Sequence, residues 1–288
     1  MTELLATSFS FNIWTDLQTM WQYGFMQHAF ETGTVVAIVA GVVGYFVVLR
    51  RLSFAAHALS HVGFAGAAGA VLMGLNPLIG LLAFTSGGGL AMALLGRRAA
   101  SQDVQIGTVL AFMLGLGVLF ISLYKGYATE AYSLLFGEIL GISRGDVLVT
   151  VIAGIIILVV VAIMYRRLLF TSLDEDVAEA KGVSLLKTGI IFMLLIALAT
   201  SIAVQVVGVL LIFALMVTPA AIAERLAQRP AQGVLIAVSV ALIATWFGLF
   251  ISYYQPYPVS FFITSLVFVL YIIVRLTQTR RDRKSLAK

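Results

Sequence analysis

The sequence predicts an all-α protein, a polytopic transmembrane helical bundle that takes in residues 1–288 as one domain. Hydrophobic residues make up 61% of the 288 residues, charged residues only 11%, and the mean hydropathy is +1.06. A soluble domain carries about 25% charged residues, so this chain could not cover a surface that faces water. The charged residues are also spaced widely enough for apolar helices to cross a bilayer between them. A soluble enzyme, a disordered tail and a coiled coil are therefore excluded.

Stretches without Asp, Glu, Lys or Arg locate the spans, because a helix needs about 20 apolar residues to cross the hydrocarbon core. These stretches cover residues 32–49, 52–96, 104–124, 147–165, 188–223 and 230–274. The runs 52–96 and 230–274 are long enough for two spans each, with turns at Asn76-Pro77 and at Gln255-Pro256-Tyr257-Pro258, where proline stops a helix. The run 188–223 fits either two short helices or one span with a re-entrant piece.

The basic residues decide between these alternatives. With nine spans and the N-terminus outside, all of the 18 Lys and Arg residues except Lys125 and Arg144 fall on the cytoplasmic side. Treating 188–223 as one span would scatter this bias, so we predict eight to nine spans, and nine by this count. Residues 1–31 contain no Lys or Arg and are expected to form an outer interfacial segment without the basic start of a signal peptide. Residues 277–288 are expected to form a cytoplasmic tail.

One span carries two histidines on a helix built from small residues. Residues 62–70 are mostly Gly and Ala, which lets neighbouring helices approach closely, so this helix is expected inside the bundle. His57 and His61 are four residues apart and share one helix face. Neutral imidazole binds Zn²⁺, Fe²⁺ or Mn²⁺, and polar groups inside a membrane are costly and usually functional. The pair is therefore predicted to contact a divalent metal, although hydrogen bonds to neighbouring carbonyls are the alternative. An HExxH protease is excluded, because Ala58 follows His57.

Two other segments depart from plain membrane-spanning helix. The apolar middle of the outer loop 125–146 is too short to cross and is expected to be re-entrant or interfacial. Glu130 and Glu138 in this loop are outer-face candidates for attracting a cation or docking a protein. Pro219, next to Thr218, interrupts the hydrogen bonding of its helix, which membranes tolerate where a helix lines a cavity or faces protein. Thr218 and Pro219 are therefore gating candidates.

A short cytoplasmic helix is expected at residues 173–182. It begins with acidic residues, which suit the N-terminus of a helix, and ends at a glycine, which suits the position after the C-cap. A cytosolic partner could grip such a helix between two spans. The residues expected to take part are Asp174, Glu175, Asp176, Glu179 and Gly182.

Missing motifs narrow the function further. The sequence contains no GxxxxGK[ST] phosphate loop, so the chain is not expected to hydrolyse ATP, and no catalytic residue is assigned. The chain has no Cys, which excludes a disulfide framework and a thiolate metal site. The net charge of +5 reflects the basic residues on the cytoplasmic side and does not indicate binding to nucleic acid.

Four segments, in this order, resemble the membrane subunit of the ABC-3 family of ABC importers, which serves zinc, manganese and iron uptake. They are Arg50-Arg51-Leu-Ser-Phe with Ala58-Leu-Ser-His61, Leu135-Phe-Gly137, Ala178-Glu-Ala-Lys-Gly182, and Val207-Gly-Val-Leu-Leu through Pro219-Ala-Ala. The resemblance covers most of the chain, from about residue 50 to residue 225. Each segment alone is short and common, and their combination carries the resemblance.

The resemblance implies a homodimer of permeases around a central path in the plasma (inner) membrane of a prokaryote. Two cytosolic ATPase subunits would grip the helix at 173–182, and an extracytoplasmic metal-binding protein would deliver the ion. The metal would be the transported substrate and not a permanent cofactor. Family members commonly carry Asp where this chain has His57, followed by the His that matches His61. The change favours zinc, with manganese or iron as alternatives, because Zn²⁺ prefers nitrogen to oxygen more than Mn²⁺ does.

Two other kinds of transport protein compete with this interpretation. A permease for siderophores or cobalamin would share the cytoplasmic helix but would not need paired histidines in a span. A secondary metal carrier is expected to place coupled acidic residues inside the membrane, and no Asp or Glu falls within a predicted span.

Overall fold

The computed structural model describes residues 13–95, 102–124, 139, 141–255 and 257–286. In these residues the regular secondary structure is entirely α-helical, as the composition predicts. The helices are α1 (Ile13–Trp21), α2 (Gly24–Leu49), α3 (Ser53–Leu72), α4 (Pro77–Leu95), α5 (Gln102–Leu123), α7 (Arg144–Leu173), α8 (Glu175–Ala180), α9 (Leu185–Val207), α10 (Val209–Leu226), α11 (Pro230–Tyr254) and α12 (Val259–Leu286).

Eight helices of the described chain are long and apolar enough to cross a membrane: α2, α3, α4, α5, α7, α9, α11 and α12. Eight crossing helices among the described residues agree with the predicted eight to nine spans, and the ninth segment of the preferred count is α10. The run 188–223 does form two helices, α9 and α10, which meet at Gly208 with a φ of +83°. The apolar part of α10 ends at Ala223, before Glu224 and Arg225. At 1.5 Å per residue it covers about 22 Å, less than a hydrocarbon core of about 30 Å.

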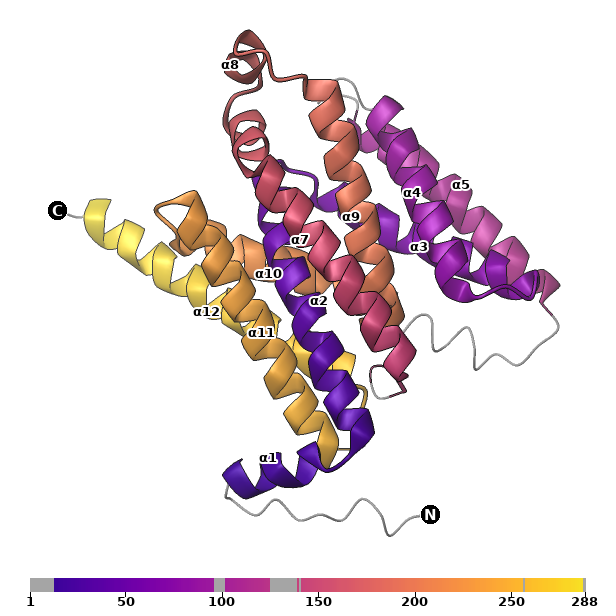
Figure 1. The fold of residues 1–288 in the computed structure, drawn as a ribbon. Coiled ribbons are helices and arrows are strands. Elements are labelled where there is room, and N and C mark those ends of the chain that lie inside the picture. The colour runs from indigo at the N-terminus through magenta and orange to yellow at the C-terminus, as the bar shows by residue number, and fades with distance from the viewer. Residues whose placement is uncertain (1–12, 96–101, 125–138, 140, 256, 287–288) are drawn as a thin grey trace.

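The first crossing helix also starts earlier than the charge pattern indicates. α2 begins at Gly24, so residues 24–31 of the segment 1–31 form the first turns of this helix. Glu31 ends the apolar run in the sequence, but its side chain is exposed near the start of α2 and does not interrupt the helix. α1 precedes α2 as a separate short helix (Figure 1).

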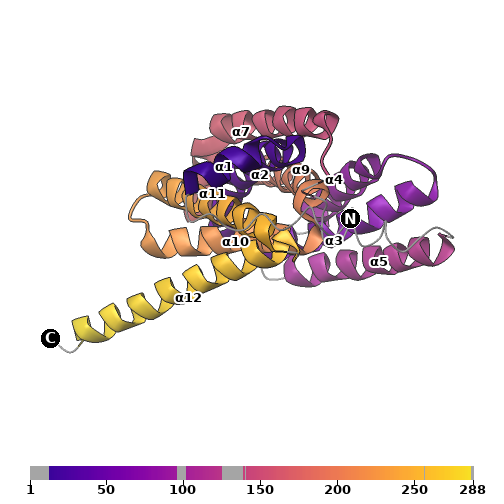
Figure 2. The ribbon, with the colours of Figure 1, turned by 90° about the horizontal axis from the view of Figure 1, so that it is seen from below.

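The helices divide into an inner and an outer group. Most of the crossing segment is buried in α3, α9 and α2, whereas α5, α12 and α7 are largely exposed. α3, α4 and α5 pack together on one side of the bundle, and α10, α11 and α12 pack together on the other (Figure 1). Viewed from below, α5, α7 and α12 lie at the rim (Figure 2). The histidine-bearing helix α3 therefore belongs to the interior, as its small residues predict.

Glycine allows the closest contacts among these helices. A Cβ atom added at Gly66 of α3 would collide with the carbonyl oxygen of Gly80 in α4, and one added at Gly80 would collide with the carbonyl of Gly66. Gly44 of α2 approaches the carbonyl oxygen of Met216 in α10 in the same way. Close backbone packing of this kind is how membrane helices associate without a hydrophobic driving force between them.

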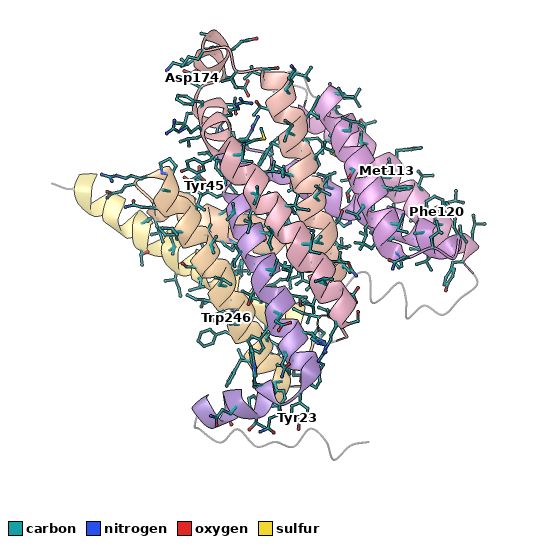
Figure 3. All side chains as sticks on the ribbon, viewed as in Figure 1. Tyr23, Tyr45, Met113, Phe120, Asp174 and Trp246 are labelled. Atoms are coloured by element: carbon teal, nitrogen blue, oxygen red, sulfur yellow. The ribbon has the colours of Figure 1, made fainter. Side chains whose placement is uncertain are left out.

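The two ends of the bundle carry different side chains. Near α1, aromatic rings cluster, with Tyr23 and Tyr253 at 6.2 Å and Trp21 and Phe30 at 6.0 Å between ring centroids. Belts of Trp and Tyr are typical of the membrane–water interface. The acidic helix α8 lies at the opposite end, and Figure 3 shows Asp174 and Tyr23 at these two ends.

Candidate functional site

The two predicted histidines lie side by side on α3. Their ring centroids are 4.7 Å apart, and the ring planes are nearly perpendicular at 84°. Between Ala55 and Ala70, only His57, His61 and Phe64 are not fully buried, and these residues follow helical spacing along one face. The histidines therefore occupy the single stripe of this interior helix that neighbouring helices leave partly open. Side chains that line a transport path require such a position.

Ring contacts fix the orientation of His57. Phe213 of α10 packs against this imidazole with ring centroids 4.8 Å apart and an interplanar angle of 66°. The Nδ1 atom of His57 is buried and has no hydrogen-bond partner among the described residues. The Ser60 hydroxyl donates to the backbone carbonyl of His57 at 2.7 Å and leaves the ring unengaged. A metal-binding histidine is usually held by a hydrogen bond from its second nitrogen. Among the described residues, His57 is held by ring packing and has no such bond at Nδ1, so its metal-binding role stays a prediction.

The described residues of one chain offer few candidate metal ligands. The described residues contain no group of three or more His, Cys, Asp or Glu side chains that could hold a metal ion together. A structural zinc site has four protein ligands and a catalytic one has three. Two imidazoles provide fewer, which suits an ion that binds briefly and moves on.

The contact of Phe213 with His57 could not be found from the sequence. Phe213 lies in α10, inside the segment from Val207 to Ala221 that carries the family resemblance, but nothing in that segment indicates that this ring packs against His57. The gating candidates Thr218 and Pro219 lie on the same helix, where Thr218 is half-buried and Pro219 is buried. Among the described residues, no hydrogen bond or ring contact joins Thr218 or Pro219 to the histidines, and their role in gating stays a prediction.

The predicted cytoplasmic helix is present as α8. The Asp174 carboxylate accepts a hydrogen bond from the backbone N–H of Val177 at 3.0 Å and so caps the first turn. At the other end, Gly182 has a φ of +80°, and the N–H of Val183 donates to the carbonyl of Ala178 at 3.0 Å. Ala178 is buried and anchors the helix to the bundle. The remaining acidic residues of the predicted set, Glu175, Asp176 and Glu179, are exposed.

Some predicted positions lie outside the described residues. Glu130 and Glu138, with most of the expected re-entrant segment, belong to this group, as does the Leu135-Phe-Gly137 motif. Next to this region, Ser143 and Asp146 cap the start of α7 reciprocally, and Gln205 of α9 donates to the Asp146 carboxylate at 2.8 Å. The acidic group at the start of α7 is therefore engaged in holding helices together.

The interior histidine pair, the crossing helices and the capped polar helix at one end define a membrane-embedded transport subunit. The chain belongs to the ABC 3 transport family, whose model matches residues 22–278. The resemblance drawn from the motifs is thereby confirmed. The chain is a multi-pass protein of the plasma membrane and a non-catalytic permease subunit, and family membership excludes a secondary carrier.

Named relatives extend over most of the chain. The manganese transport system membrane protein MntC of Listeria innocua is 34% identical over 82% of this chain and 85% of its own length. The manganese import system permease protein ScaB of Streptococcus parasanguinis is 33% identical over 92% of this chain and 96% of its own length.

Solved structures give the same fold. The PsaBC structure from Streptococcus pneumoniae in complex with Fab matches with a TM-score of 0.81 and 31% identity, over 91% of this chain and 95% of that one. An inward-facing protein assigned as a metal-chelate type ABC transporter matches with a TM-score of 0.67 over 90% of each chain. Its sequence identity is 16%, so this likeness shows the fold alone.

Proposed function

We propose that this chain is the transmembrane subunit of an ABC importer that moves a divalent transition-metal ion into the cytoplasm. Two copies would surround the path, and a separate cytosolic ATPase subunit would drive the cycle. An extracytoplasmic solute-binding protein would deliver the ion at the end where α1 lies. The observation that carries the proposal is the pair of stacked imidazoles, His57 and His61, on the open stripe of the most buried crossing helix.

The donor set favours zinc over manganese. His57 and His61 offer nitrogen atoms, and no Asp or Glu of the described residues joins them in a cluster of three possible ligands. Imidazole suits Zn²⁺, whereas carboxylate and water suit Mn²⁺. The named relatives are manganese proteins, so manganese is the competing cargo. A second copy of the chain would bring a second histidine pair to the path and could complete the coordination.

The first experiment tests whether metal uptake depends on ATP hydrolysis by a separate subunit. Cells that produce the chain with its ATPase and solute-binding protein should accumulate radioactive Zn²⁺. An ATPase subunit that cannot hydrolyse ATP should abolish this uptake. The purified chain alone should show no ATP turnover, since its sequence contains no phosphate loop. ATP hydrolysis by the isolated chain, or unchanged uptake with the inactive ATPase subunit, would contradict the proposal.

The second experiment tests α8 as the surface that the ATPase grips. Gly182→Val should lower ATP-driven uptake by more than about tenfold, because a β-branched residue is disfavoured at a φ of +80° and the helix end would shift. Gly189→Val in α9 is the matched control, since a side chain there meets nothing within 4 Å. Normal uptake and normal association with the ATPase in Gly182→Val would remove this assignment.

A further inference from the structure

The turn between α2 and α3 connects the histidine-bearing helix to the rest of the bundle. The N–H of Leu52 donates to the carbonyl of Val47 at 2.8 Å, and the N–H of Arg51 donates to that of Val48 at 2.9 Å. Arg51 has a φ of +58°, a conformation that glycine usually takes at this place in a helix end. α3 then starts at Ser53, so His57 lies little more than one helical turn further along. Any displacement of this turn is passed directly to the histidines.

Arg50, at the end of α2, contacts two other helices. Its Nη1 atom donates to the Thr171 hydroxyl at 3.2 Å, near the end of α7. Its guanidinium carbon lies 5.2 Å from the ring centroid of Phe192 in α9. Thr171 and Phe192 are both buried. A planar guanidinium can hydrogen-bond and stack on an aromatic ring at once, which a lysine ammonium cannot do in the same way.

α7 and α9 are the two helices that carry α8 between them. α7 ends at Leu173, α8 covers Glu175–Ala180, and α9 starts at Leu185. Burial lowers the pKa of the Arg50 guanidinium, and the negative charge of Glu175, the first residue of α8, opposes that shift. Arg50 therefore contacts α7 by a hydrogen bond and α9 by a ring contact, the two helices that α8 connects, and the charge of Glu175 in α8 acts on it from there.

We propose that Arg50 is a positioning residue that transmits movement of α8 to α3 and so to His57 and His61. The inference rests on the proposed function, in which an ATPase moves α8. When the ends of α7 and α9 shift with α8, Arg50 follows them, and the turn that Arg50 begins carries α3 along. Arg50 changes where the two histidines lie and does not contact the ion itself.

Arg51 provides a matched control for this proposal. It is the next residue, carries the same charge on the same turn, and its side chain is exposed. Gln at either position removes one positive charge from the same membrane edge, so an effect on topology would be equal in the two variants. Neither Arg nor Gln is glycine, so the backbone at position 51 is equally disfavoured before and after the change.

The experiment uses the complete transporter, permease with its ATPase subunits, in proteoliposomes, and measures radioactive Zn²⁺ uptake and ATP hydrolysis in the same preparation. Arg50→Gln should lower the metal transported per ATP by about tenfold, whereas Arg51→Gln should stay within about twofold of the parent. The half-saturating Zn²⁺ concentration should stay unchanged, because both histidines and the Phe213 ring that packs against His57 are intact. Phe192→Leu and Thr171→Val should lower the same ratio less and add little to Arg50→Gln, as expected for one connected group.

Three results would overturn the inference: a parental ratio in Arg50→Gln, equal losses in Arg50→Gln and Arg51→Gln, or additive losses with the partner variants. If Arg50→Gln does not reach the membrane, the ratios in Thr171→Val and Phe192→Leu decide, and parental values in both overturn it. Failure of the proposed function looks different. In that case the parental transporter itself moves neither Zn²⁺ nor Mn²⁺ when ATP is supplied.

Discussion

α3 and α5 pack against each other and are nevertheless opposite in character. The crossing segment of α3 is 78% buried, the largest share among the eight crossing helices, and it has the lowest hydropathy of them. The crossing segment of α5 is 11% buried, the smallest share among the eight, and its hydropathy is higher than that of α3. In water the more hydrophobic helix would lie inside. In lipid, whose tails are as apolar as leucine, small and polar residues mark the interior. The histidine pair that we propose to contact the metal lies on the helix that a hydropathy scale ranks last.

The largest expected difference between the two helices concerns transport. His61→Ala on α3 should reduce metal uptake by more than about a hundredfold while the amount of protein in the membrane stays the same. Losing a metal ligand is expected to cost more than losing a contact that supports a ligand, which typically costs about 10- to 100-fold. Thr108→Ala on α5, at an exposed position whose hydroxyl bonds only to its own helix, should leave uptake unchanged. Uptake assays with immunodetection of both variants compare them directly. Equal uptake in the two variants would remove the functional distinction between the helices.

The next difference concerns packing. Gly66→Ala on α3 should destabilise the protein by about 1–3 kcal/mol, because the new methyl group meets the backbone of α4. Gly115→Ala on α5 meets nothing within 4 Å and should be neutral or stabilising by up to about 1 kcal/mol. Thermal unfolding of the detergent-solubilised variants measures both. If both substitutions shifted the unfolding temperature in the same direction, the close approach of α3 and α4 would not be what holds α3 inside.

The smallest effect concerns the ring that orients His57. Phe213→Ala should raise the half-saturating metal concentration about threefold to tenfold, the equivalent of one lost aromatic contact of about 0.5–1.5 kcal/mol, with little change in maximal uptake. Phe213→Tyr keeps the ring and should behave like the parent. Phe112→Ala on α5, where the side chain is 64% exposed, is the control. A parental half-saturating concentration in Phe213→Ala would show that the ring does not position the ligand.

The features that could be predicted are those that depend on neighbouring residues in the sequence. The helical class, the interior position of α3 and the capped helix α8 follow from composition, from the small residues at 62–70, and from an Asp and a Gly at the two ends of a short segment. The number of crossing helices could be predicted only as eight to nine, because a charge-free run does not show where the apolar part of a helix ends. Phe213 and the contacts of Arg50 could not be predicted, since they join helices that are distant along the chain.

The ratio of Zn²⁺ to Mn²⁺ uptake in His57→Asp tests most directly whether His57 and His61 contact the passing ion. A carboxylate in place of one imidazole offers oxygen to the ion, so the ratio should move towards Mn²⁺ while transport is retained. A folding defect would lower both uptakes together and could not produce that shift. An unchanged ratio, together with parental zinc uptake in both His57→Ala and His61→Ala, would contradict this contact and make the pair a structural feature of α3.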